Sequence, residues 1–394
     1  MLSGIKVVEI CGIGPGPFCA MHLADLGADV IAVERDAAPG APPSLLNRGK
    51  RSIVADLKTA EGRELVLKLV EDADALIEGM RPGVMERLGL GPAQCAARNP
   101  RLVYGRMTGW GQSGPLAQAA GHDNNYIALS GALYYNGTAA EPPQSAITLI
   151  GDVGGGALYL AVGLLAGVLK ARESGKGTVV DASIVDGSAH MMQLLLATRQ
   201  KGLVTGVRGQ NMHDSSHFFA TYRCADAHFI TLGSLEPQFH ALLLEKLGLQ
   251  DDPRFAGQQW DRARWGDMHA HFAEIFASRT RSEWSELLEG TDVCFAPVLS
   301  PTEAAQHPHM VSRGIYFERD GLLQSKPAPR FDGEAVTPGP LPRRGEHGAQ
   351  ILAAIRAGEA GGVWRDRRDS PAAGTDRART PHDSAATHNQ ETQT

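Results

Sequence analysis

The first 34 residues contain the pattern that most restricts the fold, because they read as two strands joined by a loop and a helix. The apolar runs KVVEI (residues 6–10) and DVIAVE (residues 29–34) predict buried strands. Between them stand a glycine-rich loop at residues 12–17 and a helical segment at residues 18–26. A strand, a crossover helix and a second strand are typical of a parallel sheet covered by helices. The sequence therefore predicts an α/β fold that begins with a Rossmann-like layer.

The same pattern raises the question of a dinucleotide site. Glu34 follows the first glycine of the loop by about 20 positions, as an acidic residue does in NAD-binding proteins. In those proteins a third glycine lets the helix pack closely on the strand, but Pro17 stands at that position here. Pro15 also stiffens the loop and removes one backbone donor. An NAD-dependent oxidoreductase stays open as an alternative, although a Rossmann-like layer without NAD fits these residues better.

Composition and charge restrict the class of protein. A length of 394 residues is sufficient for two domains, and a net charge of −6 argues against a general nucleic-acid-binding protein, which needs a basic excess. The five cysteines have no CxxC spacing, so neither a disulfide framework nor a metal site is expected. The chain enters its first strand without a signal peptide, and the apolar run at residues 157–169 is short and contains glycines. We expect a cytoplasmic, soluble enzyme without a membrane or nucleic-acid partner.

Basic side chains follow several of the expected strands. Arg35 follows the second strand, and the runs RGKRS (residues 48–52) and ADLK (residues 55–58) come next. The run RPGVMER (residues 81–87) follows a strand expected at residues 75–78. Ligands of open α/β sheets bind beyond the carboxyl ends of the strands. Solvated surface charge is the simpler interpretation of any one cluster. Three clusters at equivalent strand ends favour a phosphate-rich ligand such as coenzyme A.

A histidine and an aspartate stand near the two ends of the segment from residue 121 to residue 156. His122 lies among glycine and polar residues, and Asp152 precedes an apolar helix predicted to reach about residue 170, so it suits an N-cap or a first turn. Taken alone, His122 could be structural and Asp152 a simple cap. The three glycines at positions 154–156 weaken a helix, and close approach of a ligand would explain them. An imidazole and a carboxylate that face one pocket can transfer protons on two sides of a substrate.

The second half of the chain predicts a smaller unit and two connections. Residues 186–200 read as one helix, and a hairpin about residues 225–227, helices near 261–278 and 281–289 and a strand at 293–299 predict an α+β unit. Glu236 precedes a proline that suits a first helical turn, so it could simply cap that helix. The proline-rich residues 301–340 predict a largely extended return connection. After residue 360 the polar composition predicts disorder.

Several motifs together resemble CoA-transferase family III, the CaiB/BaiF-like proteins, over roughly the first 350 residues. The motifs are GPGPF (residues 14–18), RGKRS (48–52), RPGVME (81–86) and RGQNM (208–212). GHD (121–123) with NY (125–126), and LEPQF (235–239), resemble the branch of the family that racemises 2-methylacyl-CoA thioesters in fatty acid metabolism, and Asn124 departs from its pattern.

The resemblance implies a domain organisation and a set of site residues. It implies a large Rossmann-like domain at residues 1–185, completed by about 330–360, and a small α+β domain at 216–300. Linkers at 186–215 and 301–329 join them, a disordered tail spans 361–394, and two chains form an interlocked homodimer. The implied acid and base are His122 and Asp152, with Glu236 assisting the histidine. Coenzyme A, as part of the substrate and not a separate cofactor, would lie along Arg35, Ala55, Asp56, Leu57, Lys58, Gly79, Met80, Arg81, Arg87, Gly121, Asp123, Asn124, Asn125 and Tyr126.

The resemblance implies a racemase that interconverts 2R and 2S 2-methylacyl-CoA. One of the two groups removes the α-proton, an enolate forms, and the other group returns a proton to the opposite face. Backbone N–H groups at the start of the Asp152 helix are candidates for stabilising the enolate oxygen. A family III CoA-transferase, with Asp152 as nucleophile, is the main alternative. A non-catalytic acyl-CoA-binding protein would show the same basic clusters without chemistry.

Overall fold

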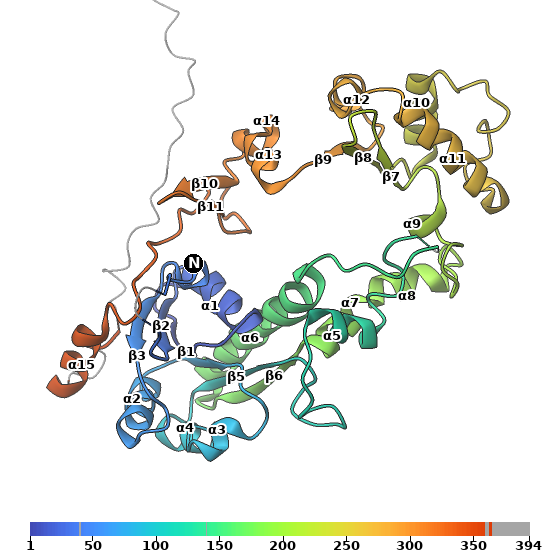
Figure 1. The fold of residues 1–394 in the computed structure, drawn as a ribbon. Coiled ribbons are helices and arrows are strands. Elements are labelled where there is room, and N and C mark those ends of the chain that lie inside the picture. Colours follow the sequence, from blue (N-terminus) through green and yellow to red (C-terminus); the bar gives the residue numbers. More distant parts are fainter. Residues whose placement is uncertain (39–40, 139, 359–361, 365–394) are drawn as a thin grey trace, which may run out of the picture.

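A six-stranded parallel sheet forms the centre of the first half of the chain (Figure 1). The computed structural model describes residues 1–38, 41–138, 140–358 and 362–364. The strands are β1 (Lys6–Ile10), β2 (Asp29–Glu34), β3 (Arg51–Val54), β4 (Ala75–Glu78), β5 (Val103–Thr108) and β6 (Thr178–Ser183). Their order across the sheet is β3-β2-β1-β4-β5-β6. The predicted α/β class with a parallel sheet is confirmed.

Helices cover both faces of this sheet because neighbouring side chains of a strand point to opposite faces. Val7 packs with α1 (Pro15–Asp25) and α6 (Leu158–Ser174) on one face. Val8 packs on the other face, in a core shared with α2 (Ala60–Val70), α3 (Val84–Arg87), α4 (Pro92–Arg98) and α15 (Gly348–Ala357). Helix α15 thus returns from the far end of the chain to the large sheet. The short helix η1 (Leu45–Asn47) leads into β3.

A three-stranded antiparallel sheet with its own core lies in the second half of the chain. It has the order β7-β8-β9, with β7 (Thr221–Arg223), β8 (Phe229–Leu232) and β9 (Phe295–Val298). The helices are α10 (Pro237–Leu247), η3 (Arg262–Arg264), α11 (Trp265–Phe276) and α12 (Arg281–Leu288). Phe272 and Trp284 are buried in the shared core. The predicted hairpin at residues 225–227 is present, and the domain boundaries assigned to this unit stay predictions.

The segments between these two sheets differ from the sequence-based expectation. The single helix expected at 186–200 is two helices, α7 (Ile184–Met191) and α8 (Gln193–Gln200), followed by α9 (Met212–Ser215). The segment expected to be extended after residue 301 holds α13 (Pro301–Gln306), α14 (Pro308–Ser312) and the hairpin β10 (Tyr316–Arg319)–β11 (Leu322–Ser325). Ser300 and Glu303 cap α13 reciprocally, with Pro301 at its first position. The prolines therefore start helices here as well as interrupting them.

The basic run at residues 48–52 does not face a ligand, which corrects its assignment to a phosphate-binding cluster. It enters β3 at the amino end of the strand, and its three long side chains are buried. Arg48 pairs with Asp25, Lys50 with Glu9 and Arg51 with Asp29. Buried cations require such partners because desolvation of an unpaired charge is costly. These residues stabilise the interior of the protein.

The expected tail begins later than residue 361. Trp364 is 6% exposed and belongs to the core of the large sheet, and the Arg51 guanidinium donates to the Val363 carbonyl at 2.7 Å. The disorder predicted for the rest of the tail falls on residues 365–394, outside the described residues.

One continuous helical stretch, Leu149–Ser174, is long and apolar enough to cross a membrane by length and composition, with a mean hydropathy of 1.7. It was expected to be too short. Its α6 part packs against β5 and β6 inside the large sheet's core, as a core helix does. The absence of a membrane partner and the cytoplasmic location stay predictions.

Candidate active site

A cavity of about 320 Å³ opens at the carboxyl edge of the large sheet. The loop after β1, at residues 12–17, and the loop after β4, at residues 79–82, both line it. The strand order reverses between β1 and β4, and ligands of open α/β sheets bind at such a switch point. The cavity thus lies between β1 and β4, where the chain connections after these two strands lead in opposite directions along the sheet.

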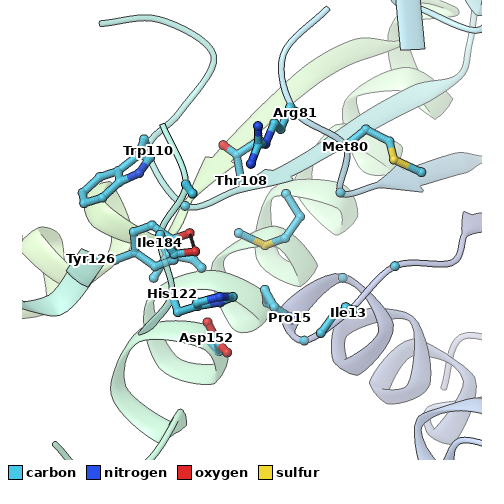
Figure 2. Close-up of a pocket in the computed structure, with 18 of the residues that line it drawn as sticks. Ile13, Pro15, Met80, Arg81, Thr108, Trp110, His122, Tyr126, Asp152 and Ile184 are labelled. Carbon is cyan, nitrogen blue, oxygen red and sulfur yellow. Dashed lines mark hydrogen bonds between the residues drawn. The ribbon is translucent and has the colours of Figure 1, made fainter. Parts of the chain in front are cut away.

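His122 reaches this cavity from the start of α5 (Asp123–Ser130). It is the N-cap residue of the helix, and its backbone N–H donates to Asn125 Oδ1 at 3.0 Å. Gly121, immediately before it, lies against the rings of Trp110 and Tyr126, where an added Cβ would overlap the Tyr126 ring. The glycine is required for this close packing. Together these contacts aim an exposed imidazole into the cavity (Figure 2).

Asp152 reaches the same cavity from a π-helical segment, η2 (Leu149–Ala157), which continues into α6. The residue lies in the first turn of this segment, where backbone N–H groups lack intrahelical partners. Its own N–H donates to Asp123 Oδ1 at 2.7 Å. Segments of π-helix are rare and frequently mark functional sites. The sequence indicated a first turn correctly but did not indicate the wider π-helical geometry.

The two side chains interact with each other across the cavity. Burial raises the pKa of Asp152 above its ordinary value, the nearby Asp123 carboxylate raises it further, and His122 opposes the shift. Figure 2 shows the imidazole and the carboxylate facing the same space, beside Pro15. The α1 loop approaches from that side, because a Cβ on Gly14 would lie 3.5 Å from Asp152 Oδ2. An imidazole and a carboxylate therefore adjoin one cavity.

Four basic side chains predicted to hold phosphates lie around this edge of the sheet. Arg35 follows β2, Lys58 follows β3, and Arg81 and Arg87 follow β4. Arg81 lines the cavity, and Arg35 lies next to it, with its Nη2 3.9 Å from Met80 Sδ. Within the described ranges none of the four forms an ion pair with a carboxylate, in contrast to Arg48, Lys50 and Arg51. They can therefore receive anionic groups of a ligand.

The other predicted site residues divide into two groups. Gly79, Met80, Gly121 and Tyr126 line the cavity. The rest do not: Ala55, Asp56, Leu57, Asp123, Asn124, Asn125 and Glu236. Ala55, Leu57 and Asp123 are buried, whereas Asp56, Asn124 and Asn125 are exposed.

Glu236 lies in the second unit of the chain and outside the cavity. It is exposed and precedes α10, without a side-chain bond to that helix. Figure 1 shows α10 well separated from α5 in a single chain. A contact between Glu236 and His122 thus does not form within this chain.

Several cavity residues were missed by the sequence analysis. The loop at residues 12–17 was considered for NAD and as a family motif but not as part of this site, and the segment from Met107 to Trp110 was not assigned to it. Trp110 packs edge-on against Tyr126, with ring centroids 4.7 Å apart, and Tyr126 donates to the Gly121 carbonyl. The rule that ligands bind beyond parallel strands would have indicated these residues.

An imidazole and a carboxylate beside a cavity at the switch point of a parallel sheet are typical of an α/β enzyme. No group of three or more His, Cys, Asp or Glu side chains that could hold a metal ion occurs in the part of the chain that the structure describes. The chain belongs to CoA-transferase family III, whose family model matches residues 2–348.

Known members of the family carry two kinds of activity in their names. The chain is 42% identical to the α-methylacyl-CoA racemase of Homo sapiens over 359 residues, which cover 89% of this chain and 92% of that protein. It is 31% identical to the succinate–glutarate CoA-transferase of Agrobacterium fabrum, over 90% of this chain and 95% of that protein. Among solved structures, a CaiB/BaiF family protein from Brucella suis matches with a TM-score of 0.75 at 29% identity, covering 89% of this chain and 98% of that one.

Proposed function

We propose that this protein is an α-methylacyl-CoA racemase. The observation that carries the proposal is that His122 and Asp152, from two different helical segments, adjoin one cavity and interact electrostatically. The 42% identity to the human racemase supports the same substrate class. Arg81, which lines the cavity and forms no ion pair with any described residue, suits a phosphate of coenzyme A.

The proposed reaction proceeds through two proton transfers. The Asp152 carboxylate removes the α-proton of the thioester from one face, and the electrons of the C–H bond move onto the carbonyl oxygen as an enolate. A protonated His122 then donates a proton to the opposite face of the α-carbon. The roles reverse for the other enantiomer, so the enzyme needs one protonated and one deprotonated group.

The enolate oxygen needs hydrogen-bond donors that act as the charge develops. The Asp152 N–H, expected from the sequence to serve, already donates to Asp123, and the Val153 N–H donates to the Thr148 carbonyl at 3.1 Å. In the first turn of α5 the Asn125 and Tyr126 N–H groups donate to the His122 carbonyl, at 2.8 and 3.3 Å, so the candidates are the N–H groups of Asp123 and Asn124, directly after His122. We therefore assign the donor role to the start of α5.

We also propose a homodimer in which Glu236 of one chain assists His122 of the other. The single chain leaves several large apolar side chains exposed on η2, α6 and α8, namely Leu149, Leu158, Val162, Leu169, Leu194 and Leu196. Large exposed apolar side chains on neighbouring helices are typical of protein–protein interfaces when they form one patch. The proposed dimer requires the α10 of the partner chain to lie within reach of the cavity.

The deciding experiment is α-proton exchange in deuterated water with a 2-methylacyl-CoA and no acceptor acid. With the wild-type protein we expect deuterium at the α-carbon by mass spectrometry, together with inversion of that carbon. His122→Ala and Asp152→Ala should each lose inversion, because only one of the two bases remains, although both variants should still bind CoA. A CoA-transferase would leave the α-carbon unlabelled and transfer CoA once a carboxylic acid acceptor is added. Absence of both reactions with CoA binding intact would identify a non-catalytic binding protein. Tight binding of NADH without CoA binding would restore the oxidoreductase alternative.

A further inference from the structure

A buried carboxylate links the two helical segments that carry the proposed acid and base. Asp123 is 6% exposed, and its Oδ1 accepts the Asp152 N–H at 2.7 Å. Its Oδ2 is buried and has no hydrogen-bond partner among the described residues. A buried carboxylate without full compensation is costly. Its presence beside Asp152 therefore needs a reason other than packing.

The backbone opposite Asp123 is shaped to admit this carboxylate. Gly151 immediately precedes Asp152, and a Cβ on it would overlap Asp123 Oδ1 and lie 3.0 Å from Ile127 Cγ2. Only glycine leaves room for the carboxylate to reach the next N–H. The hydrogen bond thus depends both on Asp123 as the acceptor and on glycine at position 151.

Asp123 is also the chain neighbour of His122, so one residue connects the imidazole with the segment that holds the carboxylate. We propose that Asp123 is a positioning residue that holds Asp152 through its backbone and places a negative charge beside it. This proposal rests on the racemase function proposed above, and it differs from the coenzyme A contact that the family resemblance implied for the residue. The cavity lining agrees, because His122 and Asp152 contribute to it and Asp123 does not.

The negative charge of Asp123 raises the pKa of Asp152, the proposed base. After burial, it is the largest cause of the raised pKa of Asp152, and His122 acts against it. Burial and then the Asp152 carboxylate raise the pKa of Tyr126 of α5, and Arg81 opposes that shift. The groups from the α1 loop and from α7 that lie nearest to Asp152 and the η2 glycines are uncharged, namely Gly14, Pro15, Ser188 and Met191, and α7 also carries Asp186 and His190. A raised pKa makes Asp152 a stronger proton acceptor.

The test separates the charge of Asp123 from its hydrogen bond. Asp123→Asn keeps an oxygen that can accept the Asp152 N–H but removes the charge, and Asp123→Ala removes both. For Asp123→Asn we expect the acid limb of the kcat/KM profile to move to lower pH by about one unit. For Asp123→Ala we expect kcat to fall by about 100-fold with KM unchanged, because the base is misplaced. Asp74→Asn is the matched control, since Asp74 Oδ2 also accepts a backbone N–H, from Lys6 at 2.9 Å, at the opposite edge of the sheet.

A second readout keeps this test independent of the racemase activity. The carboxyl ¹³C resonance of Asp152 should titrate at lower pH in Asp123→Asn than in the wild type, whether or not the α-proton exchanges. A wild-type protein without exchange but with this shift would refute the racemase and leave the contact standing. The inference is overturned if a folded Asp123→Asn variant titrates like the wild type. It is also overturned if Asp123→Ala raises KM with kcat unchanged, which would indicate a contact with coenzyme A.

Discussion

At the scale of single residues, the buried pair of Glu9 and Lys50 shows how this protein uses charge in its interior. Lys50 Nζ lies 2.5 Å from Glu9 Oε2, and neither side chain is exposed. Lys50 also donates to the Pro17 carbonyl at 3.2 Å, at the loop that lines the cavity. Burial raises the pKa of Glu9 despite the opposing effect of Lys50. Loss of either partner would therefore leave the other as an unpaired buried charge.

Lys50→Met tests this dependence. We expect the free energy of unfolding at pH 8 to fall by about 3–5 kcal/mol, because Glu9 is left as an unpaired buried charge. The pKa of Glu9 is higher in the folded than in the unfolded protein, so the cost grows as pH rises through the folded-state pKa and shrinks at acid pH. Urea unfolding at two pH values measures both effects. Arg98→Ala, which breaks solvent-exposed pairs with Glu64 and Glu71, should cost far less, and an equal loss in the two variants would contradict the prediction.

The raised pKa of Asp152 predicts the acid side of the pH profile. The carboxylate must be ionised to accept the α-proton, and burial followed by Asp123 makes ionisation harder. We expect kcat/KM to rise with pH through a value above the ordinary aspartate range of about 4 and to fall again when His122 can no longer be protonated. A profile of kcat/KM against pH measures this. An acid limb at or below the ordinary aspartate range would show that Asp152 is not the base.

At the scale of elements, the site depends on close packing between η2 and α7. An added Cβ on Gly155 would lie 2.7 Å from the Ser188 nitrogen, and one on Gly187 would overlap the Gly155 carbonyl. Two backbones therefore touch where η2 turns into α6. This approach holds the π-helical segment that carries Asp152.

Gly187→Ala should move η2 away from α7. We expect a loss of about 1–3 kcal/mol in the free energy of unfolding, as in other overpacked interiors, together with a lower kcat. Gly266→Ala is the control, because Gly266 is an exposed residue of α11 with nothing within 4 Å of an added Cβ. That variant should change stability by less than about 1 kcal/mol, in the stabilising direction. Denaturant unfolding and the exchange assay measure both effects, and a neutral Gly187→Ala would contradict the packing argument.

At the scale of the whole molecule, the position of Glu236 outside the cavity has a consequence for assembly. If the partner chain supplies Glu236, His122→Ala and Glu236→Ala chains are each inactive alone but form one intact site when paired. We expect co-expression to restore part of the activity in the heterodimer, which mass measurement can verify. A mixture of His122→Ala and Asp152→Ala chains is the control and should stay inactive, because both residues belong to the same cavity. Verified heterodimers without recovery would refute the shared site.

The end of the chain allows a second test at this scale. Trp364 is buried in the core of the large sheet, and Arg51 contacts both Val363 and Trp364. We expect a chain shortened to end at residue 366 to keep the wild-type melting temperature. A chain that ends at residue 360 should melt at a lower temperature, because it loses the buried tryptophan. Equal melting temperatures of the two shortened chains would show that Trp364 does not contribute.

The sequence by itself determined the features that depend on short-range pattern. The apolar runs before and after residues 12–17 were enough for a parallel α/β sheet, because burial on two faces requires continuous apolar strands. His122 and Asp152 were recognised from their glycine-rich surroundings, and both adjoin the cavity. Local spacing also located the hairpin in the second unit.

Only the tertiary structure decided which charged residues face a ligand and which face the interior. The runs that contain Lys50 and Arg81 look alike in sequence, but the first pairs with a buried carboxylate and the second lines the cavity. Asp123 was assigned to coenzyme A, whereas its side chain turns inward to a backbone group 29 positions away. Burial and long-range hydrogen bonds arise from strand order and helix packing, which a local pattern does not contain. The chemistry of each residue type was therefore readable from the sequence, and its partner was not.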